Sequence, residues 1–265
     1  MWYTISWNVA GRAGASASTP ASYEGYSDKR FTVRPVAGKA IIPAAGFTVK
    51  AKRGITYGGK MYRQVKSYEN LQKAIFPGVG EYGIPELRGG DYPVDNWISF
   101  NFAKTCDEPE KHGIHFFVDD YQFSRLWNTP DTYTPMLRKF QAVCTPDFST
   151  YTDFPKIMQV YNHYRKHWLG AYWEMQGLNV IPTISWSDES SYDWCFDGEP
   201  VGTTVAVSSV GTQKGQEARE LFIAGYNEML RRLKPSKVIF YGKVPDGITG
   251  NIVRVKAFTE KWKDR

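Results

Sequence analysis

The chain has 265 residues, of which 42% are hydrophobic and 15% aromatic, and it carries a formal net charge of +6. This length and composition allow a buried core, and without a run of about 18 apolar residues a membrane span is not expected. Neither a basic–apolar leader at Met1 nor a CxxC pair among Cys106, Cys144 and Cys195 is present. We therefore expect a globular protein of the reducing cytoplasm of a host cell, without zinc knuckle, iron–sulfur cluster or disulfide framework.

The basic charge is concentrated in the first third of the chain. Residues 1–90 hold 13 Lys and Arg against 5 Asp and Glu, a net charge of +8, whereas residues 91–265 have a net charge of −2. This asymmetry predicts two parts, a basic β-rich N-terminal region over 1–90 and an α/β domain over 91–265. Within the first part, residues 11–28 are rich in Gly, Ala and Ser and are expected to be flexible.

Residues 31–66 alternate between apolar and polar side chains in the manner of strands. Gly58-Gly59 separates two such runs and predicts a hairpin. Cations interleaved with tyrosines on strands suit phosphate contacts and base stacking, although a solvated β surface is the alternative. The candidate nucleic-acid-binding residues are Lys50, Lys52, Arg53, Lys60, Arg63 and Lys66.

From about residue 97 onward, short apolar runs alternate with helical patterns. The strands are expected at 97–102, 114–118, 142–144, 180–184, 204–207, 237–241 and 253–257. The clearest helices are expected at 155–176 and 215–233. Strand–helix repetition predicts a parallel sheet in an α/β fold, either a complete or partial (β/α) barrel or, alternatively, an open doubly wound sheet.

Polar residues follow most of these strands. Ligands bind at the carboxyl ends of the strands in both barrels and open α/β sheets. Each polar group has a simpler explanation as a helix cap, a solvated turn or a plain loop. The catalytic candidates are Asp119, Asp120, Asp147, Asp188, Glu189 and Lys243. The ligand-binding candidates are Trp186, Ser208, Ser209, Gly211 and Tyr241.

Carboxylate oxygens suit Mg²⁺ or Mn²⁺, and the candidate ligands are Asp119, Asp147 and Asp188. The helical pair His163 and His167 lacks the glutamate of an HExxH zinc motif, and Arg165 and Lys166 lie between the two imidazoles. We therefore expect HYRKH to form a basic solvated helix face.

Several longer segments within about 114–242 resemble one family. They are HFFVDDYQFSRLWN, TPDFSTYTDFPKIMQVYNHYRKHWLGAYW, VIPTISWSDE, WCFDGEP, VAVSSVGT and GYNEMLRRLKPSKVIFYGK. These segments are similar to an uncharacterised family of phages and mobile elements, domain of unknown function 4417. The resemblance implies an intracellular protein encoded by a phage, a prophage or a mobile element, and it transfers no activity.

Three functions follow from these residues. The leading hypothesis is a protein that acts on nucleic acid, in which carboxylates hold a metal, metal-bound water attacks a phosphodiester and Lys243 steadies the developing charge. The second is a barrel hydrolase on a small or sugar-like ligand stacked by Trp186, Trp194 and Tyr241. The third is a non-catalytic protein that binds a host factor. The sequence does not fix the oligomeric state.

Overall fold

The computed structural model describes residues 56–57, 60–61 and 69–263, with side chains over 69–260. The chain divides into two units, Met1–Phe47 and Thr48–Arg265, and every described residue belongs to the second. Strands β1 (Thr56–Tyr57) and β2 (Lys60–Met61) pair antiparallel, which confirms the predicted Gly58-Gly59 hairpin.

The remaining predictions for the basic region fall on residues that are not described. The flexible segment 11–28 lies there, and so do five of the candidate cations, Lys50, Lys52, Arg53, Arg63 and Lys66. Only the backbone of Lys60 is described. The nucleic-acid role of these residues stays a prediction.

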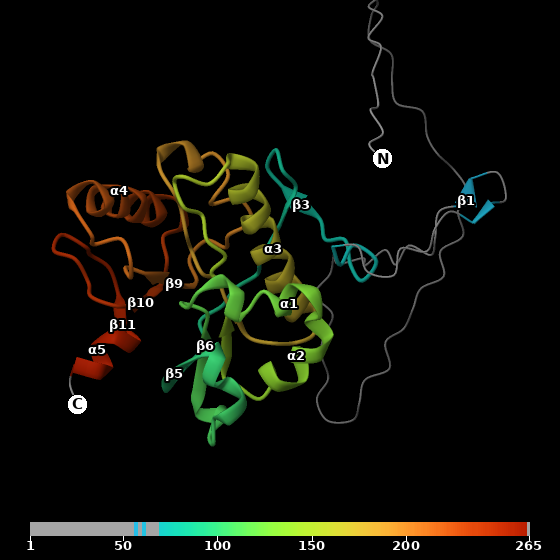
Figure 1. Ribbon diagram of the computed structural model, residues 1–265, viewed down its shortest axis with the longest axis horizontal. Helices are drawn as coiled ribbons and strands as arrows, with labels where there is room; N and C mark the ends of the chain where they lie inside the picture. The colour runs from blue at the N-terminus through green and yellow to red at the C-terminus, as the bar shows by residue number, and fades with distance from the viewer. Residues whose placement is uncertain (1–55, 58–59, 62–68, 264–265) are drawn as a thin grey trace, which may run out of the picture. The chain divides into compact units, whose positions relative to one another are not determined.

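Two parallel sheets form the α/β part of the chain (Figure 1). The first contains β5 (Asn96–Ser99), β6 (His112–His115), β7 (Ala142–Cys144) and β8 (Val180–Ile181), in that order. The second contains β9 (Thr204–Ser208), β10 (Lys237–Tyr241) and β11 (Ile252–Val255). A parallel bridge between Thr183 and Ala206 continues the first sheet into the second.

The strands therefore lie side by side in chain order from β5 to β11. A doubly wound sheet reverses its strand order at a switch point, and this sheet has no such reversal among its described strands. No pairing between β5 and β11 occurs in the described part of the chain, so a closed barrel is not found there. The predicted α/β class is confirmed, with a sheet in sequential order.

The two long helices match the sequence prediction to within one residue at each end. Helices α3 (Lys156–Met175) and α4 (Gln216–Leu233) follow β7 and β9. Three shorter helices are α1 (Arg125–Asn128), α2 (Pro130–Leu137) and α5 (Phe258–Lys263). Single 3-10 turns span Phe100–Thr105, Pro109–Lys111, Asp120–Gln122 and Glu189–Ser191. The first of these turns ends the strand predicted at 97–102 early, because Phe100 and Ala103 turn into the core.

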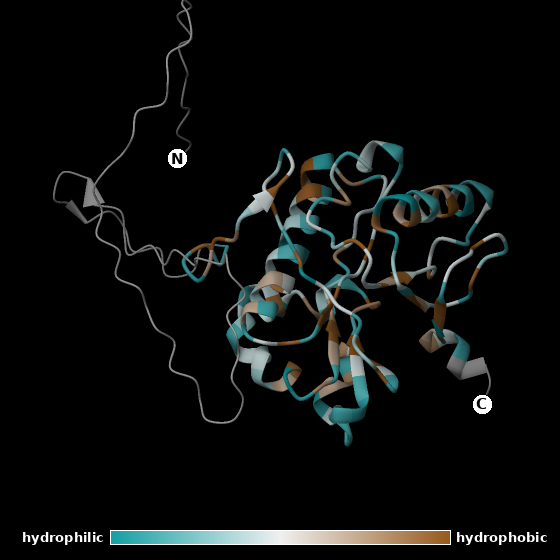
Figure 2. Cartoon of the chain, turned by 180° about the vertical axis from the view of Figure 1, so that it is seen from behind, coloured by the Kyte–Doolittle hydropathy of each residue, from teal (hydrophilic) through white to brown (hydrophobic). Residues whose placement is uncertain are grey.

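Strand β10 divides the core into two parts because successive side chains point to opposite faces of a sheet. Val238 and Phe240 pack with Phe222 and Tyr226 of α4, whereas Tyr241 faces the other cluster. Figure 2 shows brown on the central strands, while the helices carry both teal and brown stretches. Burial of the apolar strand residues is the main force that holds the helices on the sheet.

The segment before β5 also packs on this core. Strands β3 (Gly78–Val79) and β4 (Ile84–Pro85) form a small hairpin beside α3. The carboxylate of Glu174, near the end of α3, accepts hydrogen bonds from the backbone N–H groups of Arg88 at 3.0 Å and Gly89 at 2.9 Å. These contacts join the end of the predicted basic region to the α/β core. No described helix is long and apolar enough to cross a bilayer.

Candidate functional site

Asp120 lies just after β6 and is held by the loop that follows β7. Its Oδ1 accepts a hydrogen bond from Ser149 Oγ at 2.8 Å, and its Oδ2 accepts one from Ser149 N at 3.1 Å. The Ser149 carbonyl in turn accepts a hydrogen bond from Asn162 Nδ2 of α3 at 2.5 Å. Two neighbouring strand ends and one helix therefore fix the position of this predicted catalytic carboxylate.

Asp147 lies in the same loop and, unlike Asp120, makes no hydrogen bond or ion pair with the described residues. Its half-buried position raises the pKa of this carboxyl to about 7, with the nearby Asp120 adding to the rise and Lys166 opposing it. A carboxyl with a pKa close to neutral can take or give a proton in a reaction at physiological pH. The structure thus brings two of the predicted catalytic residues, Asp120 and Asp147, to one place.

Arg165 of α3 lies against the loop that carries Asp147. Arg165 stacks on Phe148 with its guanidinium carbon 4.0 Å from the ring centroid, and it donates a hydrogen bond to Asn162. Its Nε is buried and has no hydrogen-bond partner in the described residues. Burial lowers the pKa of this guanidinium, and the charge of Asp120 is among those that oppose the shift. The sequence pattern had placed Arg165 only on a solvated helix face.

The HYRKH prediction was wrong. His163, Lys166 and His167 are 2%, 1% and 0% exposed. Lys166 Nζ donates hydrogen bonds to the carbonyl of Thr183 at 2.8 Å and to Glu199 Oε1 at 2.7 Å. The charge is tolerated because Glu199, which lies in the WCFDGEP segment, is buried with it. No local pattern could have paired two residues that are 33 positions apart.

Tyr241, a predicted ligand-binding residue, lies inside an aromatic cluster. Its ring centroid is 4.5 Å from that of His115 and 5.0 Å from that of Phe117, both from β6 and its loop. Its hydroxyl accepts a hydrogen bond from Phe258 N at 3.0 Å. Tyr241 is only 5% exposed, so it is placed for packing between strand ends rather than for stacking on a ligand in solution.

The loop after β8 uses its polar residues locally. Asp188 Oδ1 accepts a hydrogen bond from Ser190 N at 2.9 Å and so caps the 3-10 turn Glu189–Ser191. Trp186 packs on Phe222 of α4 with ring centroids 5.4 Å apart. Asp119 and Glu189 are exposed. The structure gives no contact of Asp188 or Asp119 with Asp147, so their shared role as metal ligands stays a prediction.

The predicted residues after β9 and β10 hold two loops together. Ser209 Oγ donates a hydrogen bond to the carbonyl of Lys243 at 2.6 Å, and Ser208 Oγ accepts one from Val210 N at 3.1 Å. Gly211 has a φ of 88°, a left-handed conformation that suits glycine. The side chain of Lys243 is exposed beside an open pocket of about 320 Å³.

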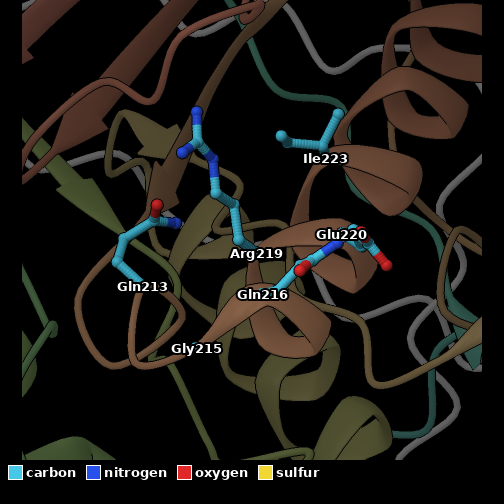
Figure 3. A pocket seen from close by; sticks show the side chains of 6 residues that line it. All are labelled: Gln213, Gly215, Gln216, Arg219, Glu220 and Ile223. Carbon is cyan, nitrogen blue, oxygen red and sulfur yellow. Dashed lines mark hydrogen bonds between the residues drawn. The ribbon is translucent and has the colours of Figure 1, made fainter.

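A larger open pocket of about 610 Å³ lies at the start of α4 (Figure 3). Figure 3 shows Arg219 extending upward from α4, with Gln213 on the loop before that helix. Arg219 forms an ion pair with Asp246 at 3.6 Å. The pocket is lined by Gln213, Gly215, Gln216, Arg219, Glu220 and Ile223. None of the residues predicted from the sequence to bind a ligand lines it.

These observations define the class of the protein. It is an α/β protein with a sequential parallel sheet and two neighbouring carboxyls at its strand ends. The chain belongs to the family described as "Domain of unknown function (DUF4417)", whose profile matches residues 76–259. It is 38% identical over 195 residues to the "Gene 1 protein" of Mycobacterium phage D29, covering 73% of this chain and 72% of that protein. It is also 36% identical to the "Gene 1 protein" of Mycobacterium phage L5, covering 73% of this chain and 85% of that protein.

The resemblance to a phage family that the sequence motifs indicated is thereby confirmed. No solved structure matches the chain.

Proposed function

We propose that this member of a phage protein family acts on nucleic acid and carries out phosphodiester chemistry at Asp120 and Asp147 with Mg²⁺ or Mn²⁺. The observation that carries the proposal is the unpartnered carboxyl of Asp147 beside an Asp120 that Ser149 holds in place. Mg²⁺ usually keeps several waters and binds one or two carboxylates together with substrate phosphates, so this pair is sufficient. Metal-bound water would then be the attacking group.

Neighbouring side chains suit a nucleic-acid substrate. The half-buried guanidinium of Arg165 lies on Phe148, the residue after Asp147, and a guanidinium binds phosphate with good geometry. Tyr121 and Tyr151 follow Asp120 and Ser149 closely and are 77% and 61% exposed, which suits stacking on bases. Arg165 therefore takes the charge-stabilising role that the sequence pattern predicted for Lys243. The basic region 1–90 supplies further phosphate contacts.

We also propose that the sheet curls into a partial (β/α) barrel. The rings of Phe102, after β5, and Phe258, after β11, stack with centroids 6.2 Å apart, although these strands are at opposite ends of the sheet order. A double-mutant cycle with Phe102→Ala and Phe258→Ala should give a coupling energy of about 0.5 kcal/mol, as for an aromatic pair at the surface. Additive effects of the two substitutions would show that the sheet ends are apart.

The function is tested with the full chain. Fluorescent single- and double-stranded DNA and RNA are titrated across a salt series, and cleavage is assayed with Mg²⁺ or Mn²⁺. Asp147→Asn should abolish cleavage and leave binding intact. Glu217→Gln is the control because that carboxylate is exposed at the start of α4 and was not predicted to belong to a site. A multiple variant with glutamine in place of the basic candidates should weaken binding and flatten its salt dependence. The basic candidates replaced are Lys50, Lys52, Arg53, Lys60, Arg63 and Lys66.

Two results would contradict the proposal. An Asp147→Asn variant that cleaves as well as the unmodified protein removes Asp147 from the chemistry. Absence of binding to every nucleic acid at low salt removes the substrate class altogether.

A non-catalytic role is the second candidate, and exposed apolar side chains favour it. Ile157 and Met158 at the start of α3 are 71% and 46% exposed, close in sequence to the exposed Tyr151. Such side chains suit contact with a protein surface. Binding of a host protein that Ile157→Lys abolishes, with no cleavage of nucleic acid, would favour this role. The hydrolase hypothesis has less support because Trp194 is 1% exposed and packs on His163.

A further inference from the structure

His163 and His167 lie one turn apart on α3 and face the same buried carboxylate. Their ring centroids are 4.3 Å apart, and both side chains are within reach of Glu199. One ligand atom from each of the three residues lies within 4.8 Å of the others. All three residues are at least nine-tenths buried. This cluster is separate from Asp120 and Asp147 and does not depend on the function proposed above.

Hydrogen-bond acceptors surround both imidazoles. His167 Nδ1 donates to the carbonyl oxygen of Pro85 at 2.8 Å, and its Nε2 donates to Glu199 Oε1 at 2.9 Å, so a metal ion at Nε2 would take the place of that proton. His163 Nε2 donates to the carbonyl oxygen of Asp197 at 3.1 Å, which leaves Nδ1 with a lone pair. Metal-binding histidines almost always donate their second N–H to such a carbonyl or to a carboxylate.

The carboxylate of Glu199 is incompletely satisfied. Its Oε1 is 2.9 Å from His167 Nε2 and 2.7 Å from Lys166 Nζ. Its Oε2 is buried and has no hydrogen-bond partner among the described residues. An unsatisfied buried acceptor is destabilising, and more so when it is charged. One ligand atom from each imidazole and one from the carboxylate thus lie within 4.8 Å of one another, and a cation there would satisfy the carboxylate.

We propose that His163, His167 and Glu199 bind a divalent transition-metal ion that joins α3 to the 194–200 segment. Two imidazole nitrogens and one carboxylate oxygen form a ligand set that suits Zn²⁺, with water in the fourth position. Mg²⁺ and Ca²⁺ prefer all-oxygen sites and are poorer fits. The ammonium group of Lys166 neutralises Oε1 of Glu199 and leaves Oε2 of that carboxylate for the ion. Its positive charge limits the affinity for a cation but does not fill the metal position.

The test uses the full chain, stripped of metal with a chelator and then titrated with Zn²⁺ or Co²⁺. We expect one ion per chain, a rise in the melting temperature, and visible absorption bands of tetrahedral Co²⁺. His163→Gln should weaken Zn²⁺ binding by at least about tenfold, because it removes one nitrogen ligand. His112→Gln is the matched control, since that half-buried imidazole lies on β6 outside the cluster.

Lys166→Met distinguishes a metal site from an ion pair network of Lys166, Glu199 and His167 that needs no metal. If an ion occupies the cluster, removal of the ammonium group should leave Zn²⁺ affinity equal or higher. Failure of the unmodified chain to bind Zn²⁺ or Co²⁺ in a 1:1 ratio would overturn the proposal, because Lys166, Glu199 and His167 then satisfy one another alone. Equal affinity in the unmodified chain and in a folded His163→Gln variant would overturn it as well.

Discussion

The imidazole of His115 at the end of β6 lies against the phenol ring of Tyr241 at the end of β10, with ring centroids 4.5 Å apart. Strands β7, β8 and β9 stand between these two strands in the sheet order. In a flat sheet, neighbouring strands are about 4.8 Å apart, so the ends of β6 and β10 would be about 19 Å apart. The loops after β6 and β10 therefore lie side by side at one end of the fold, as the proposed curl of the sheet requires.

Asp147 should make the stability of the fold depend on pH. Its pKa is about 7 in the folded chain against 3.8 as the ordinary value, so the folded state holds a proton that the unfolded state releases between these values. Stability should consequently fall by roughly 2–4 kcal/mol as the pH rises from about 4 to about 7. Urea unfolding across this range, without divalent cations, measures the effect.

Asp147→Asn serves as the test of this assignment because the amide does not ionise. The variant should equal the unmodified chain near pH 4 and exceed its stability at pH 8. An unchanged pH profile in Asp147→Asn would show that another group titrates.

Gly225→Ala should destabilise the protein, although alanine favours helices over glycine by about 1 kcal/mol. A Cβ at Gly225 would lie 2.1 Å from Nε1 of Trp186, whose rigid indole packs on α4. We expect a net loss of about 1–2 kcal/mol in urea unfolding, because overpacking outweighs the helix preference. In a Trp186→Ala background the same substitution should become neutral or stabilising. A stabilising effect in the unmodified chain would contradict the close packing.

The segment 69–90 should be required for a stable α/β fold. A chain that begins at residue 91 loses the buried Ile84 and Leu87 and leaves the Glu174 carboxylate without its backbone partners. Its melting temperature should be far below that of a chain beginning at residue 69. Equal melting temperatures of the two shortened chains would place the start of the α/β domain at residue 91, as the charge pattern alone predicts.

Within the full chain, Glu174→Gln tests the same contact more finely. The amide offers one acceptor oxygen in place of a carboxylate that accepts from Arg88 N and Gly89 N, so we expect a loss of about 1–3 kcal/mol. Glu217→Gln is a suitable control, because that carboxylate is exposed at the start of α4.

The three cysteines should differ in their reaction with a thiol reagent. Burial raises the pKa of Cys195 to about 12 and that of Cys144 still further, and both thiols are inaccessible. Cys106 is half-buried and should account for the single fast-reacting thiol at pH 8 in the native protein. Cys106→Ser should abolish the fast phase. Fast reaction of two thiols in that variant would indicate an opened core.

Much of the fold could be predicted because its signals are local. The apolar spacing of α3 and α4 and the β-rich run Lys237–Tyr241 predicted these elements almost to the residue. The strand predicted at 180–184 was too long, since regular strand pairing covers only Val180–Ile181 before Thr183 forms its bridge with Ala206. Periodicity reports which side chains face a core, and it does not report where strand pairing stops.

The candidate site was predictable only in part. Asp120 and Asp147 stood out because they follow strands, but Asp119 and Asp188 stood out for the same reason and have different surroundings. Arg165 and Glu199 were missed as members of buried clusters. Their partners come from segments that no spacing rule connects.

By itself the sequence determined the α/β class, the two long helices, the family and the strand-end position of the polar residues. Only the tertiary structure decided which of those polar residues meet. Ser149 is 29 positions from Asp120, and Glu199 is 33 positions from Lys166. Helical and strand periods come from contacts within a few residues. The burial that raises the pKa of Asp147 and encloses Lys166 of α3 exists only once distant segments have packed.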